Sequence, residues 1–206
     1  PTYPHFSDIL RLLPEIINSS QYSIQSKNDY TGALVTRIAS LTTGTMGSIL
    51  CDAYSIPDKV LFDENTVLDI SRIGSTEAKA LLMGLLVMRL EEYRFSTRAP
   101  DGNKPLRHVT VLEEAHCLLK RCSLDQSTES SNVQGKSIEI ICNAIAEMRT
   151  YGEGFIIADQ TPSALARAAM TNTGTKVLFQ LADFADCDLA GKTVALTEGQ
   201  IVELGR

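Results

Sequence analysis

The spacing of apolar residues predicts helices in the first third of the chain. Over Phe6–Ile17 the apolar side chains recur at intervals of three and four, which is the period of one helix face, and Ser7-Asp8 provides an N-cap. The pattern repeats over Asp29–Leu41, whereas the small and polar residues of Thr42–Ser48 predict a turn. We therefore expect residues 1–65 to form a helical segment.

Beyond residue 65, short apolar runs alternate with helical patterns. The most regular run is His108–Leu112, in which apolar and polar side chains alternate before two consecutive acids. The other predicted strands are Val67–Ile70, Phe155–Ala158 and Lys176–Gln180. The predicted helices are Thr76–Tyr93 with Ser75 as its N-cap, Ser137–Thr150, and a short helix from Pro162 to Met170.

Polar, turn-forming sequences separate these elements. Ala99–Lys104 predicts a turn, and Ser123–Lys136 predicts a mobile loop. Near the end of the chain, Thr193–Leu196 and Gln200–Leu204 flank a turn sequence and predict a β-hairpin. Strands that alternate with helices form a mostly parallel sheet flanked by helices, so the predicted fold class is α/β, with one domain over residues 66–206.

Polar residues stand where three of the predicted strands end, at Asp69, at Glu113-Glu114 and at Gln160. The carboxyl ends of parallel strands meet at one edge of a sheet, where such folds bind their ligands. Two carboxylates can divide the work of nucleotide hydrolysis. We assign Glu113 to a hydrated Mg²⁺ ion, held through water, and Glu114 to the attacking water. The alternative is a pair of acids that caps the following helix.

Two further residues are candidates for the same chemistry. The amide of Gln160 could contact a γ-phosphate or the attacking water, although an exposed loop glutamine has the same appearance. Arg149 could reach a phosphate across a subunit interface, or could simply complement the dipole at the end of its helix. The roles of Glu147 and His116, which lie nearby in the sequence, stay open.

Composition and charge limit the kinds of protein to which this chain could belong. The 206 residues carry a net charge of −6, which argues against a domain that simply coats nucleic acid. A ring that touches DNA through a few loops is compatible with this charge, and the segment 123–136, with Lys136 and the nearby Lys120 and Arg121, is the candidate loop. The sequence has no membrane-length apolar run, no signal peptide and no CxxC among its five cysteines, so we expect a cytoplasmic protein.

Two segments together resemble the HerA/FtsK branch of P-loop ATPases. VTVLEEAHCLLK (109–120) is similar to the Walker B strand of that branch, and AEMRTYGEGFIIADQTPSAL (146–165) is similar to its arginine-bearing helix end, sensor strand and sensor glutamine. Residues 172–176 and the closing Gly199-Gln200 and Gly205-Arg206 resemble the elements that follow. The resemblance covers residues 66 to 206.

The resemblance implies a RecA-like core that binds ATP and Mg²⁺ and drives double-stranded DNA translocation or unwinding as a homo-hexamer, alone or with a nuclease or another effector. It assigns catalytic roles to Glu113, Glu114, Arg149 and Gln160, with nucleotide contacts from Glu113 and Gln160. By position, residues 1–65 correspond to a helical insertion.

The phosphate-binding loop GxxxxGK[ST] is absent from the 206 residues. Gly135-Lys136-Ser137 and Gly191-Lys192-Thr193 end like this loop, but Ser130 and Asp186 stand where its first glycine belongs. Because the chain starts at Pro1, we expect the loop to lie upstream, which would make this chain the C-terminal part of the core. Alone, the chain should hydrolyse ATP negligibly, since the phosphates lack their cradle.

Two other functions stay open. The chain could be an interaction module that kept the fold and lost nucleotide binding. A GxxxxGK[ST] sequence upstream would argue against this alternative. It could also be a different α/β enzyme that uses Glu113 and Glu114 for metal-assisted hydrolysis, although the three histidines, His5, His108 and His116, offer few further ligands.

Overall fold

The N-terminal segment is helical, as predicted. In the computed structural model, which describes residues 5–98, 105–121 and 128–205, the first helices are α1 (Phe6–Ser19), α2 (Ile24–Leu41) and α3 (Gly44–Leu50). His5 is the N-cap of α1, and the Asp8 carboxylate accepts the His5 N–H at 3.0 Å, so Asp8 caps this helix from within its first turn. The turn predicted over Thr42–Ser48 is confined to Thr42 and Thr43, between α2 and α3. From Gly44 onward the prediction is wrong, because burial of Met46 offsets the poor helix propensity of the glycines in α3.

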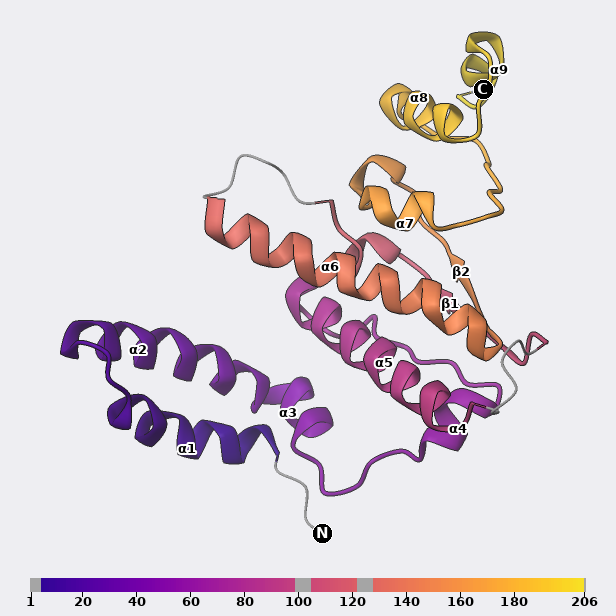
Figure 1. The fold of residues 1–206 in the computed structure, drawn as a ribbon. Coiled ribbons are helices and arrows are strands. Elements are labelled where there is room, and N and C mark those ends of the chain that lie inside the picture. The colour runs from indigo at the N-terminus through magenta and orange to yellow at the C-terminus, as the bar shows by residue number, and fades with distance from the viewer. Residues whose placement is uncertain (1–4, 99–104, 122–127, 206) are drawn as a thin grey trace.

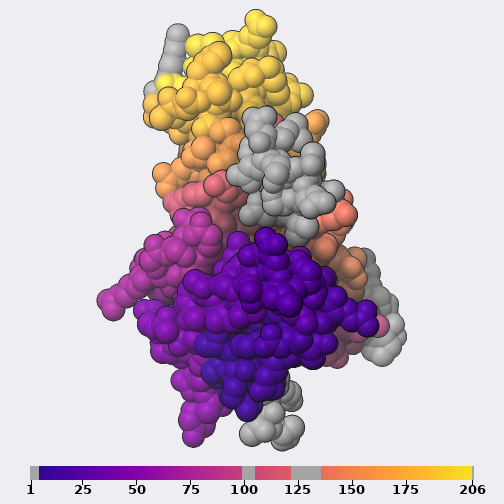
Figure 2. Space-filling model, turned by 90° about the vertical axis from the view of Figure 1, so that its left-hand side faces the viewer, coloured from indigo at the N-terminus to yellow at the C-terminus, as the bar shows by residue number. Residues whose placement is uncertain are grey.

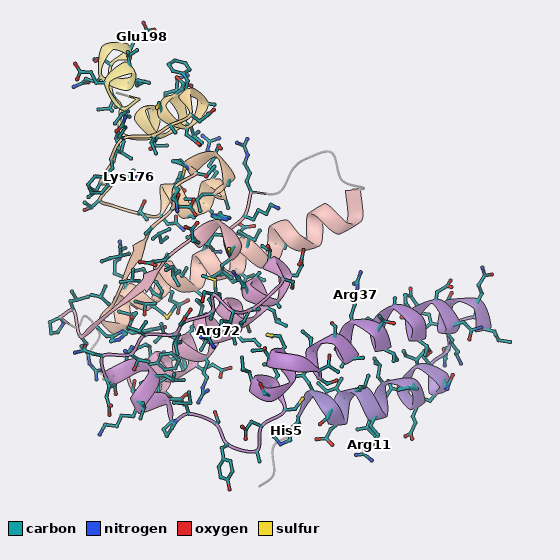
Figure 3. All side chains as sticks on the ribbon, turned by 180° about the vertical axis from the view of Figure 1, so that it is seen from behind. His5, Arg11, Arg37, Arg72, Lys176 and Glu198 are labelled. Carbon is teal, nitrogen blue, oxygen red and sulfur yellow. The ribbon has the colours of Figure 1, made fainter. Side chains whose placement is uncertain are left out.

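α1 and α2 pack as an antiparallel hairpin that extends from the body of the molecule (Figure 1). Only Ile17 of the two helices is buried. Arg11 and Arg37 project from opposite outer sides of the hairpin (Figure 3). In the space-filling view the hairpin lies at the opposite end of the molecule from the C-terminal helices (Figure 2).

Helix α5 (Thr76–Ser96) is the first large element of the body. It confirms the predicted helix and its cap, because the Ser75 hydroxyl accepts a hydrogen bond from the Ala78 N–H at 3.0 Å. The short α4 (Asp58–Asp63) packs against it. The predicted strand Val67–Ile70 is wrong: Val67 is 92% exposed, and the segment pairs with no described strand, so its backbone has no ladder to join.

The sheet within the described ranges has two strands, β1 (His108–Leu112) and β2 (Glu153–Ile157). They pair in parallel, with His108 opposite Glu153 and Leu112 opposite Ile157. Both strands were predicted, and β2 begins two residues earlier than expected. The fold is therefore mixed α/β, but the strand predicted at Lys176–Gln180 is wrong. That segment is extended without a partner among the described strands, with Phe179 79% exposed.

Helix α6 (Thr128–Met148) lies beside α5 and packs on β2 (Figure 1). Its second half confirms the helix predicted from Ser137. The predicted loop 123–136 is wrong from Thr128 onward, where the chain is already helical, while residues 122–127 lie outside the described ranges. The predicted turn at 99–104 also lies outside them. The core between these elements includes Leu90, Leu112, Leu119, Cys142 and Met148.

A buried ionic cluster joins α5 to the start of β2. Arg94 Nε donates to Glu153 Oε2 at 2.8 Å, and Nη1 donates to Asp63 Oδ1 at 2.7 Å. The other Glu153 oxygen accepts the Thr110 hydroxyl at 2.7 Å and lies 2.8 Å from His108 Nδ1. Burial of these charges is offset by the number of hydrogen bonds among them.

The C-terminal part is helical, and the predicted hairpin at Thr193–Leu204 is wrong. A 3-10 turn (η3, Pro162–Ala164) and α7 (Arg167–Thr171) replace the single helix expected after Pro162. They are followed by α8 (Phe184–Thr193) and α9 (Glu198–Glu203). Asp183 caps α8, and Thr197 with Gln200 forms a capping box on α9, so local capping favours helix over strand here.

None of the helices in the described part of the chain is both long enough and apolar enough to span a bilayer.

Candidate functional site

The candidate site lies where both strands of the sheet end. Because Leu112 is paired with Ile157, the residues that follow β1 emerge beside those that follow β2. The pairing continues past the strands: the Ala158 N–H donates to Leu112 O at 2.9 Å, and the Ala115 N–H donates to Ala158 O at 3.2 Å. Two connections that are distant in the sequence are thereby held together.

Glu114 and Gln160 meet at this edge. The Gln160 side-chain amide donates a hydrogen bond from Nε2 to Glu114 Oε1 at 2.6 Å. Glu114 has φ 49° and ψ 47°, a left-handed conformation that is unfavourable for a residue with a Cβ. This conformation bends the chain sharply after β1. Glu113 precedes the bend and its side chain is exposed.

Asp159 belongs to the same constellation, and sequence reasoning missed it. Its side chain is 3% exposed, and Oδ2 accepts the His116 backbone N–H at 2.7 Å. The other carboxylate oxygen, Oδ1, accepts the Thr161 N–H at 2.8 Å. The available signal was its place between the apolar strand and Gln160, at the same strand end as the predicted site.

His116 connects the two carboxylates. Its Nδ1 lies 3.0 Å from Asp159 Oδ2 and 3.5 Å from Glu114 Oε2. Ligand atoms of Glu114, His116 and Asp159 all lie within 4.8 Å of one another, which makes this the group of described residues that could hold a metal ion. His116, whose role the sequence leaves open, thus lies in contact with both acids.

The structure does not bring Arg149 to these acids. Arg149 begins the 3-10 turn η2 (Arg149–Tyr151), which precedes β2, and its side chain is exposed. It therefore lies at the amino end of the strand, and five strand residues at about 3.3 Å each separate it from the carboxyl end. Nearby, Glu147 accepts a hydrogen bond from the Tyr151 hydroxyl at 2.6 Å, which raises the pKa of Tyr151.

Asp69 is not at a strand end either. Its Oδ1 accepts the Ser71 N–H at 2.9 Å in a local turn, and this hydrogen bond lowers the pKa of Asp69. Of the three groups expected to converge, the structure joins those that follow β1 and β2.

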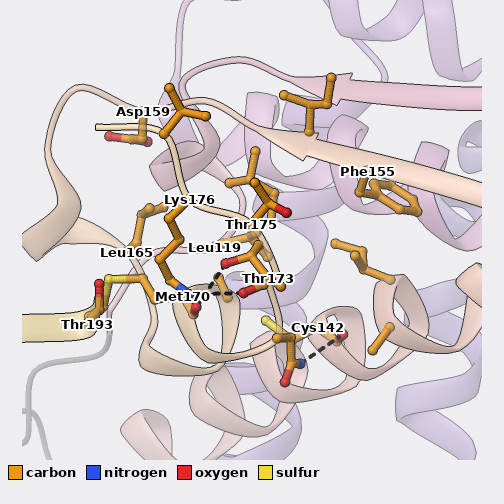
Figure 4. A pocket seen from close by; sticks show the side chains of 18 of the residues that line it. Leu119, Cys142, Phe155, Asp159, Leu165, Met170, Thr173, Thr175, Lys176 and Thr193 are labelled. Atoms are coloured by element: carbon orange, nitrogen blue, oxygen red, sulfur yellow. Dashed lines mark hydrogen bonds between the residues drawn. The ribbon is translucent and has the colours of Figure 1, made fainter. Parts of the chain in front are cut away.

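A cavity of about 660 Å³ runs along β2 on the side away from β1 (Figure 4). Asp159 lies toward one end of it and Phe155 toward the other (Figure 4). Its walls are mostly apolar, and Lys176 enters from the extended segment opposite β2, with Nζ donating to Thr173 O at 2.9 Å. The cavity thus connects the candidate site with the edge of β2 that pairs with no described strand.

The candidate DNA-contacting residues are distributed over different elements. Lys120 and Arg121 are exposed beside η3, where the Arg121 N–H donates to Ala164 O at 2.7 Å. Lys136 is exposed on α6 and not in a loop.

Comparison with known proteins gives no family: no family model, no characterised protein and no solved structure matches the chain.

Proposed function

We propose that this chain supplies the acid-bearing part of an ATP-driven motor that acts on double-stranded DNA, as the C-terminal part of a RecA-like core of the HerA/FtsK type. The observation that carries the proposal is the 2.6 Å hydrogen bond from Gln160 to Glu114 at the carboxyl ends of two parallel strands. Ligand sites of parallel α/β folds lie at such an edge.

Each residue has a distinct role in this proposal. Glu114 orients the attacking water and accepts its proton, because the hydrogen bond from Gln160 leaves Oε2 available. Gln160 fixes the Glu114 carboxylate through the 2.6 Å hydrogen bond and would sense a γ-phosphate. Glu113, exposed at the same strand end, fits a water-mediated contact with Mg²⁺, since hard cations prefer carboxylate oxygens. Bound Mg²⁺ would neutralise phosphate charge during transfer.

Arg149 acts in a neighbouring subunit if it acts in catalysis. Its place at the amino end of β2 separates it from the acids of its own chain. An exposed arginine can complete a site across an interface. We therefore propose a homo-hexameric ring, with a cytoplasmic location and a nuclease or other effector as an optional partner.

The phosphate-binding loop must come from polypeptide outside these 206 residues. The chain contains no GxxxxGK[ST], and backbone amides of such a loop provide most phosphate contacts. We expect the 206-residue chain to show no Mg²⁺-dependent ATP turnover above a buffer blank in a phosphate-release assay. Robust ATP turnover by this chain would contradict the proposal that the phosphate-binding loop lies outside it.

An interaction module is the second candidate function. The face of the sheet turned away from α6 exposes Val109, Val111 and Ile156, which are 41%, 54% and 53% exposed. Uncovered apolar surface of this kind is typical of a binding face.

The test that separates the two functions is ATP hydrolysis by the protein that includes the phosphate-binding loop, measured with and without double-stranded DNA. Turnover that rises with DNA supports the motor. Absence of turnover under both conditions would favour the interaction module. Lys120→Glu and Arg121→Glu, each tested singly, should reduce the DNA stimulation if these exposed cations contact DNA. Lys192→Glu, at an exposed position of α8, makes the same change of charge and serves as the control.

A further inference from the structure

We propose that Glu114, His116 and Asp159 form a direct binding site for one divalent transition-metal ion of the Zn²⁺ class, and that the site binds without nucleotide. The three residues lie in the two connections that follow β1 and β2. The site is distinct from the water-mediated Mg²⁺ contact assigned to Glu113.

The separations of the ligand atoms fit one ion. His116 Nδ1 is 3.0 Å from Asp159 Oδ2 and 3.5 Å from Glu114 Oε2. An ion with bonds of about 2.0–2.2 Å to nitrogen and oxygen holds neighbouring ligand atoms roughly 3.0–3.5 Å apart. The third pair of ligand atoms, from Glu114 and Asp159, lies within 4.8 Å.

Residues outside the cluster orient both carboxylates. Gln160 occupies Oε1 of Glu114, which leaves Oε2 facing His116. The Thr161 N–H occupies Oδ1 of Asp159, while Oδ2 accepts the His116 backbone N–H at 2.7 Å and faces the same imidazole nitrogen. An outer donor thus holds one oxygen of each carboxylate, and the backbone of His116 holds the other oxygen of Asp159 toward the imidazole. Metal ligands in proteins are commonly oriented by outer hydrogen bonds of this kind.

The chemistry of the three ligand atoms favours Zn²⁺ over Mg²⁺. One imidazole nitrogen with two carboxylate oxygens suits Zn²⁺ better than Mg²⁺, because Mg²⁺ prefers oxygen ligands and retains its waters. Three protein ligands leave a position for water, as in zinc sites that are not purely structural. His116 and Glu114 are 35% and 50% exposed at their side chains, so an ion can enter from solvent.

Occupancy would regulate the proposed motor. An ion on Oε2 of Glu114 prevents that carboxylate from accepting a proton from water, so Zn²⁺ should inhibit turnover. This consequence rests on the proposed function, whereas binding itself does not.

The test is titration of the metal-free 206-residue chain with Co²⁺, a spectroscopic substitute for Zn²⁺, followed by displacement with Zn²⁺ and with Mg²⁺. We expect one ion per chain, visible absorption without thiolate charge-transfer bands, and displacement by Zn²⁺ but not by equimolar Mg²⁺. Asp159→Asn and His116→Gln should each weaken binding by at least about tenfold. Glu139→Gln removes an exposed carboxylate of α6 that has no part in the proposed sites and should leave the affinity unchanged.

Two controls keep the outcome decisive. Cys117→Ser removes the thiol whose Sγ lies 3.9 Å from His116 Nε2 and should not alter binding. Circular dichroism of each variant establishes whether it folds. If Asp159→Asn fails to fold, Glu114→Gln tests the other carboxylate ligand, whose side chain is half-exposed. No uptake of Co²⁺ by the folded wild-type chain, uptake that survives loss of His116, or thiolate bands would each overturn the proposal. Absence of ATP turnover would leave this result unaffected.

Discussion

Arg94 and Glu153 form an ion pair in the interior of the protein, with Nε of Arg94 2.8 Å from Oε2 of Glu153 and the side chains 1% and 0% exposed. The pair ties α5 to the first residue of β2, and through Glu153 to His108 and Thr110 of β1. It therefore fixes the amino end of the sheet, while the candidate site occupies the carboxyl end. Stability and function can be tested separately at these two ends.

Removing one member of the buried pair should destabilise the fold strongly. Arg94→Met leaves Glu153 buried without its cation, and we expect a loss of about 3–5 kcal/mol in the free energy of unfolding measured with urea. Arg89→Met is the matched control. Arg89 pairs with Asp58 at 2.5 Å, but the side chains are 35% and 40% exposed, so this change should cost about 0–1 kcal/mol. Equal losses from both changes would contradict the assigned burial.

Acid should weaken the same cluster through Asp63. Hydrogen bonds from Tyr93 and then from Arg94 lower the pKa of Asp63 below its ordinary value of 3.8. A lowered pKa in the folded state contributes stability above the unfolded pKa, and that stability is lost as the pH falls through the folded pKa. We expect urea midpoints to fall as the pH drops below about 4, and Asp63→Asn to flatten this dependence.

The control for the acid dependence is Asp188→Asn. Asp188 pairs with Lys192 on α8 at 2.6 Å, with side chains that are 38% and 68% exposed. Its removal should leave the slope of stability against pH close to that of the wild type. A slope that Asp63→Asn does not change would show that other carboxylates carry the acid sensitivity.

Gly152 is expected to tolerate no side chain. Its φ is +85°, and a Cβ would lie 2.7 Å from Pro105 O. Gly152→Ala should therefore lower the free energy of unfolding by about 2 kcal/mol, from left-handed strain and steric overlap together. At Gly199 in α9 no atom lies within 4 Å of an added Cβ, so Gly199→Ala should be neutral or stabilise by about 0.5–1 kcal/mol. Thermal unfolding distinguishes the two, and similar effects would contradict the turn geometry.

The sequence predicted elements whose signals are local. His108–Leu112 and the cap of α5 at Ser75 were correct because alternation and a capping hydroxyl act within a few residues. The strand predicted at Lys176–Gln180 failed because a strand needs a partner, and β2 pairs with β1 alone among the described strands. The hairpin predicted at Thr193–Leu204 failed because the helix caps at Asp183 and Thr197 favour α8 and α9 over strands.

The candidate site, too, could be predicted from the sequence only in part. Parallel strands predict that Glu114 and Gln160 meet, and they do so at 2.6 Å. The place of Asp159 at the strand end was available from sequence. The orientation of its carboxylate toward the His116 N–H was not, because it arises from the bend at Glu114. Arg149 was expected to reach a phosphate across a subunit interface, which stays a prediction, and its position at the amino end of β2 follows from chain direction.

The measurement that decides the assignment of Glu114 is DNA-stimulated ATP hydrolysis by the protein that includes the phosphate-binding loop, compared between the wild type, Glu114→Gln and Glu139→Gln. Glu139 is exposed on α6, so its substitution controls for the loss of one surface carboxylate. We expect turnover to fall by about a hundredfold or more in Glu114→Gln and to be retained in Glu139→Gln. Wild-type turnover in Glu114→Gln would contradict the proposed role of the carboxylate that Gln160 holds.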